Sequence, residues 1–264
     1  MGRLAERFRM LRERGEKALI PFVTAGDPDL ATTEALVLAM AEAGADAIEI
    51  GVPFSDPLAE GPTIQRASER ALAAGTSLRR VLECVQALRP RVEVPLVLMG
   101  YTNNFLAMGA DAFATAAAEA GVDGIIVVDL PPEEGEAFYA RMRESAIDPI
   151  LLAAPTTSPA RLEKLAKETR GFLYFVSLTG VTGARRELSA TLEAELRTVR
   201  GISDVPVCVG FGVSTPEQAR EASEFADGVV IGSALIDRIE RAPSREAAVD
   251  VAAAFVAELK ARLR

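Results

Sequence analysis

Short apolar runs alternate with longer segments of helical periodicity along the whole chain, and this alternation constrains the fold more than any other feature. Runs that are apolar almost throughout are typical of strands in a parallel sheet that helices cover on both faces. In one of the segments between them, apolar residues recur at positions 78, 81, 82, 85 and 88, which is one face of a helix. The predicted strands are Ala18–Thr24, Ala47–Ile50, Pro95–Met99, Gly124–Val128, Pro149–Leu152, Phe172–Val176, Pro206–Val209 and Gly228–Ile231.

Eight strand–helix units in 264 residues predict an α/β fold, a single-domain (β/α)₈ TIM barrel over residues 1–264. An open, doubly wound sheet shows the same alternation, and the number of strands alone does not exclude it. The length of the chain favours the barrel, and no linker or repeat marks a second domain. Residues Leu4–Arg14 predict an extra N-terminal helix before the first strand.

Absent residue types narrow the chemistry. The chain has no histidine, which excludes an imidazole-based triad and a histidine-ligated metal, so acid–base work falls to Asp, Glu, Tyr, Lys or Cys. The net charge of -9 disfavours a nucleic-acid partner. Cys84 and Cys208 suit neither a disulfide framework nor a zinc motif. Without a signal peptide or a membrane-length apolar run, we expect a soluble cytoplasmic protein that binds no metal and no membrane.

Proline-containing steps mark the predicted starts of several helices. Asp27-Pro28-Asp29, Ser158-Pro159 and Thr215-Pro216 each place a capping residue beside a proline at or near the first helical position. Asp27 and Asp129 also follow predicted strands, where barrel enzymes place catalytic groups. The sequence leaves open whether these two aspartates are caps, supporting partners or catalysts.

Glu49 is a carboxylate inside an apolar strand. Its neighbours Ile48 and Ile50 face the helices, so Glu49 points into the barrel near the end where active sites form. Burial there would raise its pKa and keep part of it protonated near neutrality, as a general acid requires. The alternative is a structural glutamate paired with a lysine or an arginine.

Glycines after the last two strands predict a phosphate site. Gly210-Phe211-Gly212 follows the seventh strand and Gly232-Ser233 follows the eighth, which is the usual phosphate position of barrels. Backbone amides and a helix N-terminus bind an anion there without any basic side chain. Alternatively, the glycines only form tight turns. The residues alone thus indicate a barrel that holds a phosphorylated ligand and acts on it with carboxylates.

Four runs, EIGVPFSDPLAEGPTIQ, FVTAGDP, SLTGVTGAR and GFGVSTPEQ, resemble the tryptophan synthase alpha subunit family. The resemblance extends over essentially the whole chain. It implies a (β/α)₈ barrel that cleaves indole-3-glycerol phosphate to indole and glyceraldehyde 3-phosphate, a retro-aldol lyase reaction that needs no cofactor in this subunit.

The resemblance also implies roles for individual residues. Glu49 matches the glutamate that protonates the indole ring carbon bearing the side chain. Glu60 stands where the family usually has an aspartate that binds the indole N–H and stabilises its positive charge. The extra methylene moves this carboxylate by about 1.5 Å, and we predict that Glu60 still performs this role. The matching substrate-binding positions are Phe22 and Phe211 around the indole, Tyr174, the lid residue Thr182, and Gly183, Gly212, Gly232 and Ser233 at the phosphate.

A partner follows from the same resemblance. The alpha subunit docks on a pyridoxal-phosphate beta subunit in an alpha-beta-beta-alpha complex and passes indole to it, so pyridoxal phosphate is expected only in the partner. Pro53, Asp56 and Pro57 match positions of the docking loop. Two other hypotheses stay open: an isomerase or epimerase acting on a phosphosugar, and a catalytically weakened subunit that mainly activates the beta subunit, which Glu60 would favour.

Overall fold

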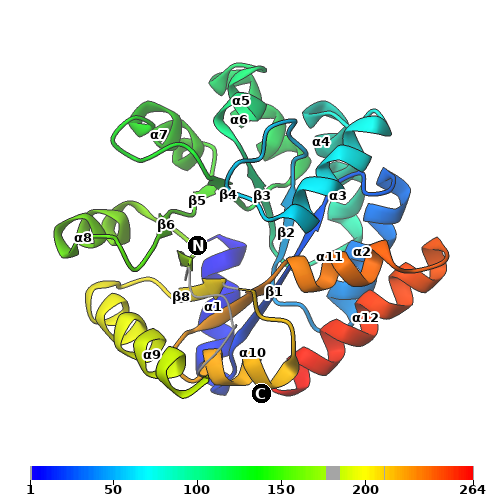
Figure 1. The fold of residues 1–264 in the computed structure, drawn as a ribbon. Coiled ribbons are helices and arrows are strands. Elements are labelled where there is room, and N and C mark those ends of the chain that lie inside the picture. The colour runs from blue at the N-terminus through cyan, green and yellow to red at the C-terminus, as the bar shows by residue number, and fades with distance from the viewer. Residues whose placement is uncertain (1, 177–184, 211, 264) are drawn as a thin grey trace.

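The computed structural model describes residues 2–176, 185–210 and 212–263. Parallel strands form its centre and helices surround them (Figure 1). The predicted barrel architecture is confirmed. The strands are β1 (Ala18–Thr24), β2 (Ile48–Gly51), β3 (Leu96–Gly100), β4 (Gly124–Val127), β5 (Asp148–Pro149), β6 (Leu152–Ala153), β7 (Leu173–Val176), β8 (Val207–Gly210) and β9 (Gly228–Ile231).

The fifth predicted strand differs from the expectation because it is split into β5 and β6. The sheet order is β5-β4-β3-β2-β1-β9-β8-β7-β6, so the two halves of this one segment lie at the two ends of the order. Pro149 has no N–H to donate to a ladder, and the Leu151 N–H binds the Thr169 hydroxyl at 3.0 Å instead of a neighbouring strand. The segment therefore pairs first with β4 and then with β7, and it closes the ring of strands.

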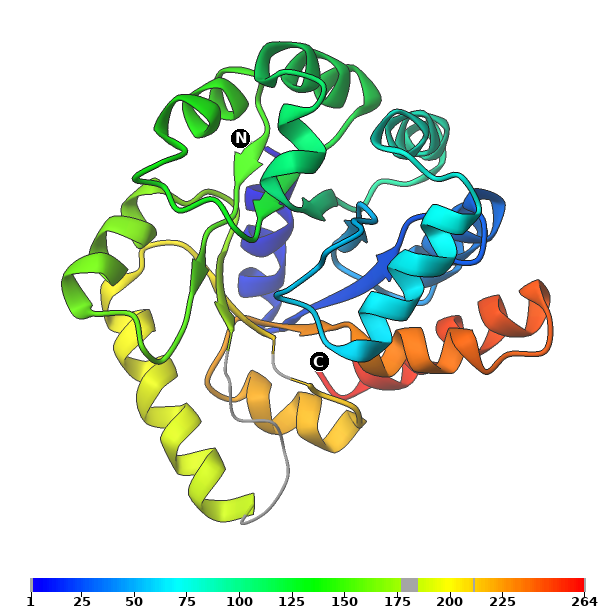
Figure 2. The same ribbon diagram turned by 45° about the horizontal axis from the view of Figure 1, so that its top comes forward.

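The helices cover the outside of the strands, and three of the expected single helices are pairs: α3 with α4, α5 with α6, and α11 with α12. In both views α3 and α11 lie side by side (Figures 1 and 2). No helix in the described ranges has the length and apolar character needed to cross a membrane. The helices are α1 (Arg3–Arg14), α2 (Leu30–Glu42), α3 (Pro62–Ala73), α4 (Leu78–Leu88), α5 (Thr102–Leu106), α6 (Ala110–Ala120), α7 (Glu136–Glu144), α8 (Pro159–Glu168), α9 (Arg185–Ile202), α10 (Pro216–Ser223), α11 (Ser233–Glu240) and α12 (Arg245–Ala261), with a 3₁₀ turn at Arg89–Arg91.

The predicted N-terminal helix α1 is confirmed, and its position explains why it is present. Its apolar residues Leu4, Phe8 and Leu11 pack against Ile20 of β1 and against Phe172, which directly precedes β7. These contacts place α1 over the end of the barrel where the strands begin. Burial of these apolar side chains stabilises the fold by roughly 25 cal/mol per Å². Helix α1 covers this end of the barrel, so only the opposite end is left for ligands.

Alternating side-chain directions set which residues face the barrel interior. In β1, Leu19 and Val23 belong to the apolar layer between strands and helices, whereas Ala18 and Ile20 belong to the interior cluster. A strand reverses side-chain direction at every residue. The same rule turns Glu49 inward in β2.

Candidate active site

Glu49 lies inside the barrel, in register with Phe22 of β1. Its side chain is fully buried, and among the residues that the structure describes neither carboxylate oxygen has a hydrogen-bond partner. The predicted inward orientation is thus confirmed, and no lysine or arginine of the described residues pairs with Glu49. Burial, and secondly the negative charge of Glu60, raise the pKa of Glu49 to about 8. Glu49 is therefore mostly protonated at neutral pH.

Glu60 lies in the loop between β2 and α3 and is half-buried. Helix α3 begins two residues later, with Gly61 as N-cap and Pro62 at the first helical position. Burial raises the pKa of Glu60 to about 7. Because the charge on Glu60 also raises the pKa of Glu49, the two carboxyls titrate as a coupled pair. Between about pH 7 and 8 the favoured arrangement has Glu49 protonated and Glu60 ionised.

Two aromatic side chains flank these carboxyls. Phe22 is buried, and Gly51 leaves space for its ring, since a Cβ at position 51 would lie 2.5 Å from the ring Cζ. Tyr174 lies in β7, and a Cβ at Gly210 would lie 2.3 Å from its hydroxyl oxygen. Burial, followed by the charges of Glu49 and Glu60, holds the pKa of Tyr174 well above its ordinary value. Tyr174 is therefore a neutral phenol that can donate a hydrogen bond.

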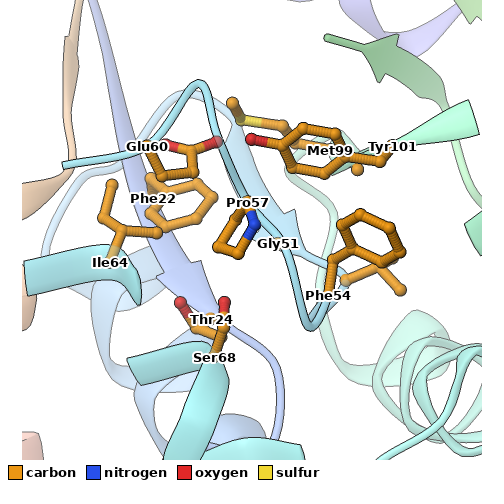
Figure 3. A pocket seen from close by; sticks show the side chains of 12 residues that line it. Phe22, Thr24, Gly51, Phe54, Pro57, Glu60, Ile64, Ser68, Met99 and Tyr101 are labelled. Carbon is orange, nitrogen blue, oxygen red and sulfur yellow. The ribbon is translucent and has the colours of Figure 1, made fainter. Parts of the chain in front are cut away.

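The loop that carries Glu60 packs closely onto the strands (Figure 3). A cavity of only about 10 Å³ remains beneath it. A space of this size has room for about one water molecule. The lining residues are Phe22, Thr24, Gly51, Val52, Phe54, Pro57, Glu60, Ile64, Ser68, Met99, Gly100 and Tyr101.

The predicted phosphate residues that the structure describes lie after β8 and at the start of α11. Gly212 adopts a φ of 55°, a left-handed conformation that favours glycine. Gly232 is the N-cap of α11 and Ser233 is its exposed first residue. The first N–H groups of a helix lack intrahelical partners and attract anions. Thr182, Gly183 and Phe211 lie outside the described residues.

The two aspartates left open by the sequence have structural partners. Asp29, not Asp27, caps α2 by accepting from the Thr32 N–H at 2.7 Å. Asp27 is buried and pairs with the Arg70 guanidinium through two hydrogen bonds of 2.7 and 2.8 Å. Asp129 accepts from the Thr102 N–H and hydroxyl at the start of α5. These contacts assign both aspartates to the scaffold.

The residues predicted at the partner interface differ in exposure. Asp56 is exposed and accepts a hydrogen bond from Ser55, whereas Pro53 and Pro57 are buried. Leu58, which the sequence did not single out, is 91% exposed. Among the described residues, no group of three or more Asp, Glu or Cys side chains could hold a metal ion.

Comparison with known proteins identifies relatives over the full length of the chain. The family model for the tryptophan synthase alpha chain matches residues 8–264. The tryptophan synthase alpha chain of Citrifermentans bemidjiense is 52% identical over 260 residues, which are 98% of this chain and 97% of the relative. The alpha chain of Burkholderia pseudomallei is 50% identical over 264 residues, with coverage of 100% and 97%.

Solved structures show the same similarity. Tryptophan synthase subunit alpha of Legionella pneumophila has a TM-score of 0.92 at 39% identity, covering 100% of this chain and 98% of that one. A chain of aminoacrylate-bound tryptophan synthase from M. tuberculosis has a TM-score of 0.89 at 36% identity, covering both chains completely. The shared sequence, fold and length show that this chain belongs to the tryptophan synthase alpha chain family.

Proposed function

We propose that Glu49 and Glu60 divide the acid and charge-stabilising roles of the reaction that this family performs. By its family the chain is an indole-3-glycerol-phosphate lyase of tryptophan biosynthesis. The observation that supports the division is that the buried Glu49 and the half-buried Glu60 have pKa values of about 8 and about 7. Carboxyls whose environments separate their pKa values commonly take opposite acid–base roles.

The reaction begins with proton transfer to the indole. Glu49 donates its proton to the ring carbon that bears the glycerol phosphate side chain, and the ring nitrogen becomes positively charged. The Glu60 carboxylate accepts a hydrogen bond from the indole N–H and stabilises this charge. The low dielectric of the site strengthens this electrostatic stabilisation. The ring is then electron-poor enough to accept electrons from the adjacent carbon–carbon bond.

Cleavage completes the sequence and restores the acid. The hydroxyl on the side-chain carbon next to the ring loses its proton, its carbon becomes the aldehyde, and the carbon–carbon bond breaks. The bonding electrons return to the ring, which is released as neutral indole. We assign the hydroxyl proton to the Glu49 carboxylate that the first step leaves, so that Glu49 is protonated again for the next turnover.

The phosphate end of the substrate is assigned to the residues after β8 and at the start of α11. Gly212, Gly232 and Ser233 hold the phosphate, while Phe22 and Tyr174 flank the ring. Binding energy from the non-reacting phosphate serves to orient the reacting carbon. We propose the same role for Thr182, Gly183 and Phe211, on the resemblance alone.

Indole release tests the proposed function directly. The purified chain should convert indole-3-glycerol phosphate to equal amounts of indole and glyceraldehyde 3-phosphate. An isomerase or epimerase would consume a phosphosugar without releasing indole. A chain that stimulates a beta subunit but releases no indole would instead be the weakened alpha-like subunit, and that result would overturn the proposal.

Activity should depend on pH as a narrow bell. The rate needs Glu60 ionised, which is lost below about pH 7, and Glu49 protonated, which is lost above about pH 8. We therefore expect kcat/KM for indole release to be highest between these values. Glu60→Gln should remove the acid limb and move the alkaline limb to lower pH, because the charge that helps to raise the pKa of Glu49 is gone. The measurement is the pH profile of the isolated chain from roughly pH 5 to 10. A profile flat across this range would contradict the assignment.

We also propose that the chain docks on a tryptophan synthase beta subunit through one apolar face. We call this the docking face: a groove of about 550 Å³, together with exposed Asp56, Leu58 and Leu106. Exposed apolar side chains that lie close together are typical of protein–protein interaction sites. The residues lining the groove are Pro53, Phe54, Ser55, Leu72, Thr76, Ser77, Leu78, Arg79, Asn103, Asn104, Ala107 and Met108.

Asp56→Ala should weaken beta-subunit binding without changing the chemistry of the isolated chain. The Asp56 side chain is exposed, so its removal deprives the interface of a charge and leaves Glu60 in place. We expect about a tenfold higher Kd in titration with the beta subunit, on the order of one lost interfacial charge pair. Glu258→Ala, an exposed change on the remote helix α12, is the matched control. Unchanged affinity and stimulation in Asp56→Ala would refute the docking loop.

A further inference from the structure

The backbone around Glu60 is held at three points. The Glu60 N–H donates to the Pro57 carbonyl at 3.0 Å and closes a turn. The preceding N–H, that of Ala59, donates to the Tyr101 hydroxyl at 2.9 Å. The Glu60 carbonyl accepts from the Gln65 side-chain amide at 2.9 Å. The loop backbone is thus held by side chains from other elements on both sides of Glu60, at the Ala59 N–H before it and at its own carbonyl.

Tyr101 is itself held in place. It is buried at the end of β3, and its ring stacks on Phe54 with centroids 5.0 Å apart. Asn104 accepts from the Tyr101 N–H and donates to the Pro53 carbonyl. Tyr101 therefore contacts the loop at two places, the Phe54 ring near its start and the Ala59 N–H near its end. A side chain with so many fixed neighbours has little freedom to move, so it transmits a defined position to the loop.

Gln65 acts from the opposite side. It lies in the first turns of α3 and is half-buried. Helix α3 is anchored by Arg70, which reaches Asp27 after β1 and Glu240 on α11. The Glu60 carbonyl is therefore linked through α3 to the strands and to the helix whose N-terminus is assigned to the phosphate.

We propose that Tyr101 and Gln65 are positioning residues that fix the loop backbone around Glu60, so that its longer side chain reaches the indole N–H. This inference rests on the proposed role of Glu60. A glutamate has one more rotatable bond than an aspartate and loses more conformational entropy when it is ordered. Fixing the backbone on both sides of Glu60, at the Ala59 N–H and at the Glu60 carbonyl, reduces the positions that the carboxylate can sample. In Figure 3 the Tyr101 hydroxyl and the Glu60 carboxylate point toward one another, and a neutral Tyr101 keeps its own O–H free to donate.

A double-mutant cycle tests the inference. Tyr101→Phe removes one oxygen and keeps the stack on Phe54, so kcat for indole release should fall about 10- to 100-fold, as for misplacement by roughly 1 Å. KM should change less than about threefold, since the phosphate residues are untouched. On a Glu60→Ala background the same change should lower kcat by less than about twofold, because no carboxylate remains to be positioned. Gln65→Leu should behave likewise.

Matched controls separate positioning from folding. Tyr139→Phe also deletes one phenol oxygen, which donates to the Leu130 carbonyl away from the site, and its kcat should equal that of the wild type. Unfolding temperatures of both phenylalanine variants should be similar. The acid limb of the Tyr101→Phe pH profile should move below pH 7 as water reaches the loosened Glu60.

The outcomes distinguish two kinds of failure. Equal fold-losses for Tyr101→Phe on both backgrounds would overturn the inference, because Tyr101 would then act on the substrate or the fold. Wild-type kcat in both Tyr101→Phe and Gln65→Leu would also overturn it, while leaving the role of Glu60 intact if Glu60→Ala is impaired. Wild-type activity of Glu60→Ala would instead refute the proposed function on which the inference rests.

Discussion

Glu49→Gln is expected to lower kcat for indole release about 10³-fold, within the range that general acid catalysis contributes. The substitution keeps the shape of the side chain and removes the only proton that the buried group can deliver. Glu49 is suited to the task because burial and the Glu60 charge hold its pKa near 8. The measurement is steady-state indole release at about pH 7.5, between the pKa values of the two carboxyls.

The same variant should remain folded and should respond differently to alkali. Glu49 has a pKa of 4.5 when unperturbed and about 8 in the fold, so between these values the unfolded state binds fewer protons. Wild-type stability therefore falls as pH rises from 4.5 to about 8. Glu49→Gln lacks this loss and should unfold at a higher temperature than the wild type at about pH 9, with little difference at about pH 4. A variant that is inactive because it misfolds would instead unfold at a lower temperature than the wild type at about pH 9.

Retained turnover in Glu49→Gln would contradict the assignment of Glu49 as the acid. Binding of glycerol phosphate offers an internal control, since we assign its phosphate to Gly212, Gly232 and Ser233. Its Kd should stay within about threefold of the wild type, because that end of the site does not touch Glu49. Loss of this binding would indicate a general disturbance of the barrel rather than of its acid.

Glu60→Gln is expected to lower kcat about 10²-fold, since it replaces the charge that stabilises the protonated ring while keeping a hydrogen-bond acceptor. Electrostatic stabilisation by one group in a buried site is commonly of this size. Because the substrate phosphate is bound elsewhere, most of the loss should fall on kcat rather than KM. Steady-state kinetics of the isolated chain, and again with the beta subunit, supply the measurement.

Glu60→Asp is the informative companion to this variant. It introduces the aspartate that the family resemblance implies at this position and withdraws the carboxylate by about 1.5 Å. If Tyr101 and Gln65 hold the loop for a glutamate, the aspartate variant should lose about tenfold in kcat, which is less than Glu60→Gln loses. Near wild-type kcat in Glu60→Gln would exclude a charge-stabilising role at this position, whatever the aspartate variant does.

Local patterns were enough to predict the barrel, the inward direction of Glu49 and the helix starts at Ser158 and Thr215. These features depend on neighbours in sequence: the period of two in a strand, a hydroxyl before a proline, and the spacing of apolar residues in a helix. The family resemblance rested on short motifs of the same local kind. For this reason the fold and the family were accessible from the residues alone.

Other features depend on residues that are distant in sequence. The fifth strand was predicted as continuous, and its break follows from Thr169, eighteen residues after Leu151. Asp27 is assigned to the scaffold by Arg70, and no local pattern predicts that pairing. Gln65 had no signal at all in the sequence, because its contact with the Glu60 carbonyl depends on the path of the loop.

Periodicity and short motifs are local, and they were sufficient to predict the architecture, the family and the two carboxylates. The pKa values of Glu49 and Glu60, and the contacts that hold them, depend instead on the folded chain. A pKa near 8 at Glu49 requires the removal of water by surrounding strands and a second charge eleven residues away. The anchoring of Glu60 requires Tyr101, from another strand end, to meet the loop. Burial and through-space contacts arise only when the chain closes into a barrel.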